Sequence, residues 1–196
     1  DFRAYFEGRG RISCTYQGKE YDFTIRDCRV YPQGWSAYLT RYNDFARYAD
    51  MTFVDIGGYT VDLFRTHNGQ RVQGSLMSIP TGTITLIKSI QDELMRQDII
   101  LTDAQVSEIL RGGPVVHMDK AIILDACQTY RAAYVRDFRN ALRERGIDVR
   151  MPLALIGGGA ELLREDLEDQ MYCVGFLDIF ANARGYKLWL ERDLRA

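Results

Sequence analysis

The pattern of hydrophobic and polar residues changes its period along the chain. Alternating or short apolar runs rich in β-branched and aromatic residues predict strands, and apolar residues spaced by three and four predict helices. The expected strands are 9–16, 19–25, 29–31, the two arms of 53–64, 71–79, 151–156 and 174–179. The expected helices are 36–49, 83–96, a short one from Thr102 to 111, 118–145, one beginning at 160, and 180–191. This succession predicts an α/β fold with a mixed sheet and flanking helices.

The helices carry apolar positions that predict how they pack. In the long helix 118–145 we expect an apolar stripe to face the sheet. Its members are Ile122, Ala126, Tyr130, Ala133, Phe138 and Leu142. In the last helix, Leu188 and Leu190 are expected to pack on a partner lobe.

Two strand-like arms within residues 53–64 meet at a Gly-Gly pair. If Gly58 and Tyr59 form the turn, the register places Asp55 opposite Asp62. Facing carboxylates repel each other, so the arrangement favours a cation between them. Mg²⁺ with a nucleotide phosphate is the obvious candidate. The alternative is an ordinary hairpin with two acids on a solvent-facing strand.

A second glycine motif lies about a hundred residues further along the chain. The apolar run 151–156 ends in Gly157, Gly158 and Gly159, and a helical pattern begins at Ala160. Backbone without Cβ atoms lets a flat base or ribose approach closely, and a helix start offers unpaired N–H groups. Glycines also serve simple tight turns, so the triplet alone does not decide the matter.

Together and in this order, the two glycine motifs resemble those of the actin-like ATPase superfamily. The likeness is greatest to plasmid-segregation actins of the ParM type and covers about residues 26–190. It includes residues 182–186, which look like the closing helix of that family. The resemblance implies the ribonuclease H-like fold, which actin shares with sugar kinases and chaperone ATPases, and it implies binding of ATP or ADP with Mg²⁺.

The resemblance also implies roles for individual residues. Asp55 and Asp62 would act on Mg²⁺ through water. The phosphates would be held by the backbone N–H groups of Gly57, Gly58, Tyr59 and Thr60. The adenosine would be admitted by Gly157, Gly158 and Gly159. Gln33, which follows a proline, would orient the attacking water, although an ordinary turn residue is the alternative there. Weaker candidates for nucleotide contact, against plain surface charge, are Lys88, Glu108 and Arg111.

Actin-like ATPases carry another phosphate hairpin near their N-terminus, and this chain has no match to it. Asp55-Ile56-Gly57 is its only Asp-x-Gly tripeptide. We therefore expect a C-terminal portion of a longer protein, inactive by itself in ATP hydrolysis. Residues 1–50 would end the first domain, 51–174 would form the second nucleotide-binding domain, and 175–196 would form a closing helix on the first domain.

Composition narrows the function classes. With 46% hydrophobic and 27% charged residues, the chain has ordinary globular usage. A net charge of −2 without a basic stripe disfavours direct nucleic-acid binding. No apolar run approaches the ~18 residues of a membrane span. The cysteines lack metal-binding spacing, and with two histidines they make no zinc set, so we expect reduced, mostly buried thiols and a cytoplasmic protein.

These observations favour a bacterial actin-like ATPase. The intact protein is expected to bind ATP–Mg²⁺ between two domains and to self-associate into nucleotide-dependent filaments. A DNA-binding adaptor protein would attach them to a plasmid for segregation. The alternative is a non-hydrolysing, nucleotide-gated scaffold related to cell-division or pilus-assembly actin relatives.

Overall fold

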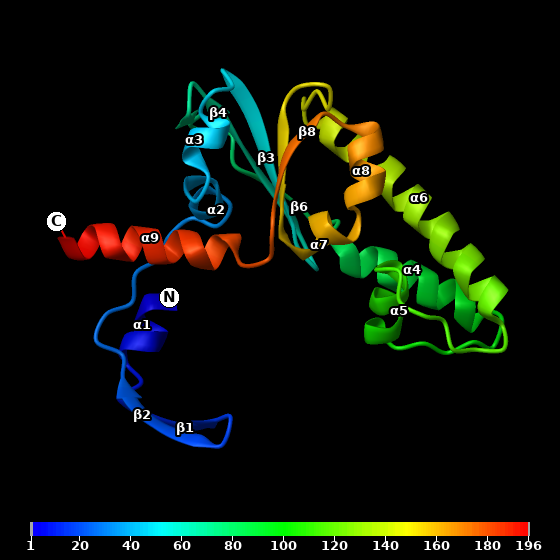
Figure 1. The fold of residues 1–196 in the computed structure, drawn as a ribbon, viewed down its shortest axis with the longest axis horizontal. Helices are drawn as coiled ribbons and strands as arrows, with labels where there is room; N and C mark the ends of the chain where they lie inside the picture. The colour runs from blue at the N-terminus through cyan, green and yellow to red at the C-terminus, as the bar shows by residue number, and fades with distance from the viewer. Residues whose placement is uncertain (1, 196) are drawn as a thin grey trace.

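The computed structural model describes residues 2–195. A six-stranded mixed sheet lies at the centre, helices cover both of its faces, and an N-terminal arm extends to one side (Figure 1). The strands are β3 Asp50–Ile56, β4 Val61–His67, β5 Gln70–Arg71, β6 Met77–Ile79, β7 Leu153–Ile156 and β8 Cys173–Leu177. Their order is β5-β4-β3-β7-β8, with β6 also paired to β4.

The two arms of residues 53–64 form the antiparallel hairpin β3–β4. Its register pairs Phe53 with Phe64 and Asp55 with Asp62, as predicted. On its other side β3 pairs with β7 in parallel, and β7 pairs with β8 in parallel. The central strands β3 and β7 are almost wholly buried. Continuous apolar runs suit strands that are covered on both faces.

Five helices cover one face of the sheet and enclose the larger hydrophobic core. They are α4 Thr83–Met95, α5 Asp103–Leu110, α6 Lys120–Glu144, α7 Gly157–Leu162 and α8 Arg164–Gln170. In α6, the buried side contains Ala126, Phe138 and Leu142 as predicted. The prediction for Ile122 was wrong, because Ile122 is 38% exposed and the next residue, Ile123, is buried instead.

The other face of the sheet is covered by α2 Trp35–Leu39, α3 Tyr42–Phe45 and α9 Ala181–Arg195. The core on this side is aromatic. Tyr38 and Phe45 pack on Phe53, and Phe53 stacks on Phe64 with ring centroids 4.8 Å apart. The domain boundary expected at residue 50 stays a prediction. Helices α2 and α3 precede this boundary but pack on the sheet that is formed mostly by residues 51–174.

The N-terminal arm consists of α1 Phe2–Glu7 and a separate hairpin, β1 Arg11–Tyr16 and β2 Lys19–Thr24 (Figure 1). In this hairpin Cys14 pairs with Tyr21. Between the arm and α2, residues 29–31 form no strand, contrary to expectation, and they contact α9. There, Arg29 forms an ion pair with Asp193, and Tyr31 stacks on Trp189.

Two further expectations about elements were wrong. The predicted helix 36–49 is split into α2 and α3, because Arg41 leaves the helical conformation at φ −133°. The predicted strand 71–79 is interrupted between β5 and β6 by a turn with Gly74 at φ +74°. Leu188 and Leu190 are 46% and 42% exposed within this chain, so their packing on a partner lobe stays a prediction.

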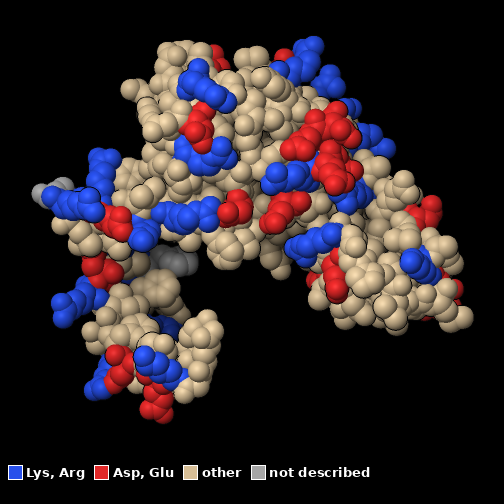
Figure 2. Space-filling model, in the orientation of Figure 1, with Lys and Arg blue, Asp and Glu red and all other residues tan. Residues whose placement is uncertain are grey.

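The exposure of the cysteines agrees only in part with the expectation of mostly buried thiols. All four cysteines are free, but only Cys127 is buried and Cys14 is exposed. On the face drawn in Figure 2, basic and acidic side chains are interspersed. Within residues 2–195, no helix is long and apolar enough to cross a membrane.

Candidate functional site

The turn of the β3–β4 hairpin is fixed by the beginning of α4. Gly57 N–H donates to the Thr60 carbonyl at 2.9 Å and closes the hairpin. The N–H groups of Gly82, Thr83 and Ile84 then donate to the carbonyls of Tyr59, Gly57 and Gly58 at 3.0, 3.0 and 2.8 Å. Amides at a helix start have no partner within the helix. Here they bind the hairpin and give it a defined position.

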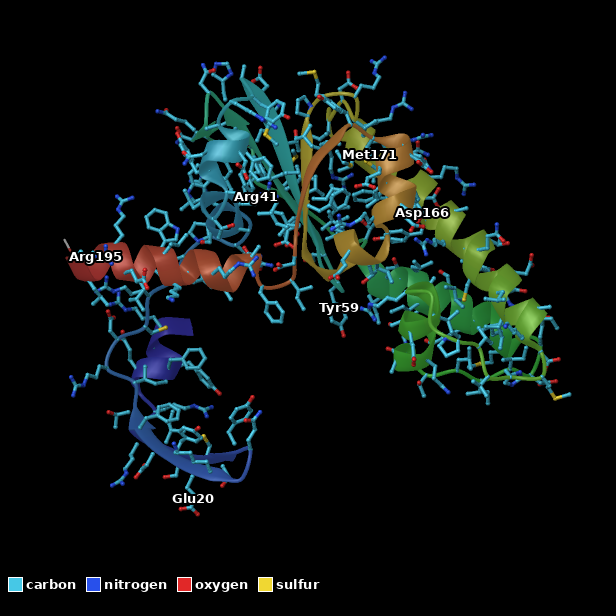
Figure 3. All side chains as sticks on the ribbon, in the orientation of Figure 1. Glu20, Arg41, Tyr59, Asp166, Met171 and Arg195 are labelled. Carbon is cyan, nitrogen blue, oxygen red and sulfur yellow. The ribbon has the colours of Figure 1, made fainter. Side chains whose placement is uncertain are left out.

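The outward amides of the turn are those of Gly58, Tyr59 and Thr60. Within residues 2–195 these N–H groups make no hydrogen bond. The N–H of Gly57 is used inside the hairpin, so the expectation that it contacts phosphate is corrected. The Tyr59 side chain is 78% exposed and projects from the end of the sheet between α9 and the α4–α5 lobe (Figure 3). A turn with several free amides can bind an anion.

Asp55 is a buried carboxylate, only 5% exposed, at the end of β3. Its Oδ2 accepts hydrogen bonds from Gln33 Nε2 at 3.0 Å and from Asn182 Nδ2 at 2.9 Å. Burial raises the pKa of Asp55, the two amide donors oppose that rise, and the charge of Asp62 adds to it. A buried acid beside another acid is a costly arrangement in the absence of a cation.

Asp62 faces Asp55 across the hairpin and accepts a hydrogen bond from Thr60 Oγ1 at 3.1 Å. Among the described residues, no cluster of three or more His, Cys, Asp or Glu side chains could hold a metal ion. Mg²⁺, however, commonly keeps several waters and binds through one or two carboxylates and substrate phosphates. The Asp55–Asp62 pair therefore fits Mg²⁺ but does not form a complete protein cage.

Gln33 is brought to the site by a turn between Pro32 and α2. The backbone of the next residue, Gly34, has φ +70°. Because the amide nitrogen of Gln33 donates to Asp55, its carbonyl Oε1 is the end that can accept a hydrogen bond from a water. Gln33 and Asp55 are 22 positions apart in the sequence, and the fold brings them together.

The glycine triplet forms the first residues of α7 and does not precede the helix as a separate loop. Gly157 has φ +91°, and a Cβ there would lie 2.7 Å from Asp55 Oδ1. Gly159 is buried, and a Cβ there would lie 2.8 Å from the Ile56 carbonyl. Both glycines are thus required where α7 packs on the hairpin. Gly158 is the least constrained, with Ile179 as its nearest neighbour at 3.3 Å.

A hollow of about 490 Å³ lies next to the triplet, between the end of α5, α6 and the α7–α8 segment. Arg111, a weak candidate from the sequence, lines it together with Glu161. Glu108 is not among its lining residues. Lys88 is directed to α5, where it forms an ion pair with Asp103 at 3.2 Å. The structure thus places Arg111 at a hollow shared with the end of α7, and it places Lys88 and Glu108 outside the lining of this hollow.

Sequence reasoning missed Asn182. This residue lies in the first turn of α9 and donates to Asp55, 127 positions earlier in the chain. The motif 182–186 was noted only as the start of a closing helix. A polar residue near the start of the expected helix 180–191 was the available signal, but its partner could be found only from the packing of α9.

Comparison with known proteins adds a family and a fold. The sequence of residues 53–169 matches the family described as archaeal actin homologue MreB-like, C-terminal. No curated protein matches the chain closely enough to count as a relative.

Several solved structures are similar to the chain in fold. The archaeal actin homologue Ta0583 has a TM-score of 0.65 at 20% identity, over 90% of this chain and 60% of its own. A ParM filament from Clostridium botulinum has a TM-score of 0.63 at 18% identity, over 89% of this chain and 56% of its own. A chain of a PilM–PilN type IV pilus biogenesis complex has a TM-score of 0.57 at 16% identity, over 79% of this chain and 50% of its own. The actin-like fold expected from the sequence is confirmed, and the chain spans 60% or less of each of these proteins.

Proposed function

The chain belongs to the family of archaeal MreB-like actin homologues, through the C-terminal domain of that family, and we propose that it supplies one half of an ATP–Mg²⁺ cleft in a filament-forming protein. The observation that carries this proposal is the constellation around Asp55. A buried acid faces a second acid, is joined to Gln33, and lies beside a turn with outward amides.

The phosphates would be held by the amides of Gly58, Tyr59 and Thr60. Asp55 and Asp62 would hold Mg²⁺ through its bound waters, and the ion would neutralise charge that develops on the transferred phosphoryl group. Hydrogen bonds from Gln33 and Asn182 keep Asp55 in one orientation. Residues 51–174 would act as the nucleotide-binding domain of this half, with 1–50 and 175–196 belonging to the junction with the other half.

Hydrolysis would depend on the position of a water. Gln33 Oε1 can accept a hydrogen bond from this water. The water oxygen would then direct a lone pair at the terminal phosphate. An amide is not a strong base, so positioning is the contribution expected of this side chain.

The adenosine would lie against the backbone at Gly158. The hollow beside it offers Arg111 and Glu161 as polar contacts for a base or ribose. Its volume of about 490 Å³ is of the order typical of small-molecule sites.

Similar structures support nucleotide binding and assembly as family traits. Ta0583 was solved in complex with ADP, Bacillus thuringiensis ParM with AMPPNP, and Clostridium botulinum ParM as a filament. By extension we propose nucleotide-dependent self-association in the cytoplasm, without membrane or direct DNA contact. A DNA-binding adaptor would then link the filament to a plasmid for segregation.

The second candidate function is a nucleotide-gated scaffold that does not hydrolyse ATP. It is favoured by the similarity to PilM in a pilus biogenesis complex with PilN. Pelleting of the full-length protein with ATP, combined with phosphate release, separates the two. Filaments with phosphate release support the actin-like ATPase, whereas ATP binding with neither supports the scaffold.

The first test is calorimetric titration of ATP–Mg²⁺ into the full-length protein and into this chain. We expect a dissociation constant below about 1 mM for the full-length protein, lost in Asp55→Ala. Lys88→Ala is the matched control, because Lys88 pairs with Asp103 and should leave binding unchanged. Equal binding by wild type and Asp55→Ala would overturn the hairpin assignment, and no binding by the full-length protein would overturn the function. Binding by this chain alone would show that half a cleft is sufficient.

A further inference from the structure

Asn182 forms hydrogen bonds through both ends of its side-chain amide. Its Oδ1 accepts from the backbone N–H of Gly34 at 2.7 Å, and its Nδ2 donates to Asp55 Oδ2 at 2.9 Å. The chemistry fixes this orientation, because a backbone N–H needs an acceptor and a carboxylate needs a donor. A rotated amide would face repulsion at both ends.

These contacts close a ring that also contains Gln33. The oxygen of Asp55 that receives Asn182 also receives Gln33 Nε2 at 3.0 Å. Gln33 is covalently joined to Gly34, which Asn182 binds at its other end. The ring therefore runs from Asn182 to Asp55, to the side chain of Gln33, and back through the peptide to Gly34. Neither Asp55 nor Gln33 can move far while Asn182 stays in place.

The position of Asn182 is itself fixed by close packing of α9. Ala181 is fully buried, and Gly185, one turn later, lies directly on α2. A Cβ at Gly185 would collide with the backbone of Ser36. At this contact α9 has little room to rotate or slide, so a shift of the helix must displace the Asn182 amide.

We infer that Asn182 is the positioning residue that holds Gln33 and Asp55 in register and couples α9 to the candidate phosphate and Mg²⁺ site. This inference rests on the proposed function of that site. A movement of α9 changes the orientation of Asp55 and of the Gln33 carbonyl together. Conversely, ligand binding at the hairpin restrains α9.

Two substitutions separate the two ends of the amide. Asn182→Asp keeps an acceptor for the Gly34 N–H but places a carboxylate oxygen against Asp55 Oδ2. Asn182→Ala removes both contacts. The exchange of partners, Asn182→Asp with Asp55→Asn, restores a donor and an acceptor between positions 55 and 182, but it moves the carboxylate from β3 to α9 and turns an amide nitrogen towards Gln33 Nε2, which loses its acceptor. Lys187→Ala, at an exposed position of α9, is the matched control.

The first measurement is amide hydrogen exchange at Gly34 in the nucleotide-free full-length protein. Asn182→Ala should accelerate this exchange about tenfold or more, because the acceptor is lost. Asn182→Asp and Lys187→Ala should leave it near the wild-type rate. Unchanged exchange in Asn182→Ala would overturn the inference.

The second measurement is the affinity for ADP with and without Mg²⁺. Asn182→Ala, which adds no charge, should weaken ADP–Mg²⁺ binding about tenfold or more, because Asp55 loses the donor that orients it, and should weaken Mg²⁺-free ADP binding much less. A merely structural role would lower both affinities equally. In the exchanged pair, Tm should recover towards the wild-type value while ADP–Mg²⁺ binding stays weak, because the carboxylate has left β3.

The outcomes distinguish this inference from the function on which it rests. If wild type binds ADP–Mg²⁺ and Asn182→Ala binds it equally well, the inference is overturned and the function stands. If wild type binds no nucleotide, the proposed function fails, and Gly34 exchange alone decides whether Asn182 holds the two residues.

Discussion

At the scale of single residues, the site depends on a few groups in energetically costly states. Asp55 is buried next to a second carboxylate, and the hydrogen bonds that its side chain accepts within residues 2–195 come from the amides of Gln33 and Asn182. Gly157 has a positive φ and leaves room for Asp55 Oδ1. Strain and buried charge of this kind persist where function requires them and the surrounding structure enforces them.

Asp55→Asn should therefore stabilise the nucleotide-free protein. Because its pKa is raised in the folded state, Asp55 contributes stability below its unfolded value, and this stability is lost as the pH rises through the raised pKa. At pH 7 the ionised side chain is a cost that asparagine removes. Thermal unfolding at pH 7 should show a Tm higher by about 2 °C or more, and the gain should shrink at pH 3.

The control for this prediction is Asp169→Asn, a change of one exposed acid that should leave Tm unchanged. A Tm for Asp55→Asn equal to or below that of wild type at pH 7 would contradict the prediction. Asp62→Asn is not suitable as a control, because its charge contributes to the raised pKa of Asp55.

At the scale of elements, the β3–β4 hairpin and α4 form one unit. Three amides at the beginning of α4 donate to three carbonyls of residues 57–59. The helix thereby directs its positive end at the back of the hairpin, which favours an anion at the front. Any displacement of the turn must also displace α4.

Gly82→Ala should break this unit. A Cβ at this position would collide with the backbone of Gly58 and Tyr59, so α4 must move away from the turn. We expect a loss of about 3 kcal/mol in the free energy of unfolding, measured with urea. Gly58→Ala is the matched control, because nothing lies within 4 Å of its added Cβ, and it should stay within about 1 kcal/mol of wild type. Equal effects of the two changes on the free energy of unfolding would argue against the close packing of α4 on the hairpin turn.

At the scale of the whole molecule, α9 connects parts that are distant in the sequence. It packs on α2 through Gly185, binds Asp55 through Asn182, and contacts the N-terminal segment through Trp189 and Asp193. The larger core on the opposite face of the sheet does not depend on these contacts. The molecule is thus expected to lose order at α9 before it loses the sheet.

Gly185→Ala tests whether α9 loses order separately from the sheet. The added methyl group should separate α9 from α2 while the larger core stays folded. Hydrogen exchange should become faster in α9 and in residues 29–36 but not in β3, β7 or α6. Ala183→Ser changes an exposed position of the same helix and should have no effect. Faster exchange throughout the sheet would show that α9 and the sheet form a single cooperative unit.

Parts of this structure were predictable from the sequence because they depend on near neighbours in the chain. The register of β3–β4 follows from strand alternation and a Gly-Gly turn. The capping box at Thr102 and Gln105 begins α5, and the apolar period gives α4 and α6 nearly to their ends. The sequence by itself therefore determined the hairpin, the main helices, the family and the pair of facing acids.

Other features depend on how elements pack, and only the tertiary structure decided them. The choice of Ile123 over Ile122 follows from a rotation of α6 on the sheet, and the break at Arg41 lets both Tyr38 and Phe45 face the same aromatic core. The ring of Gln33, Asp55 and Asn182 is closed by a hydrogen bond between Gly34 and Asn182, which are 148 positions apart. No local pattern encodes such contacts, because their geometry is set by the angle and distance at which α9 meets the sheet.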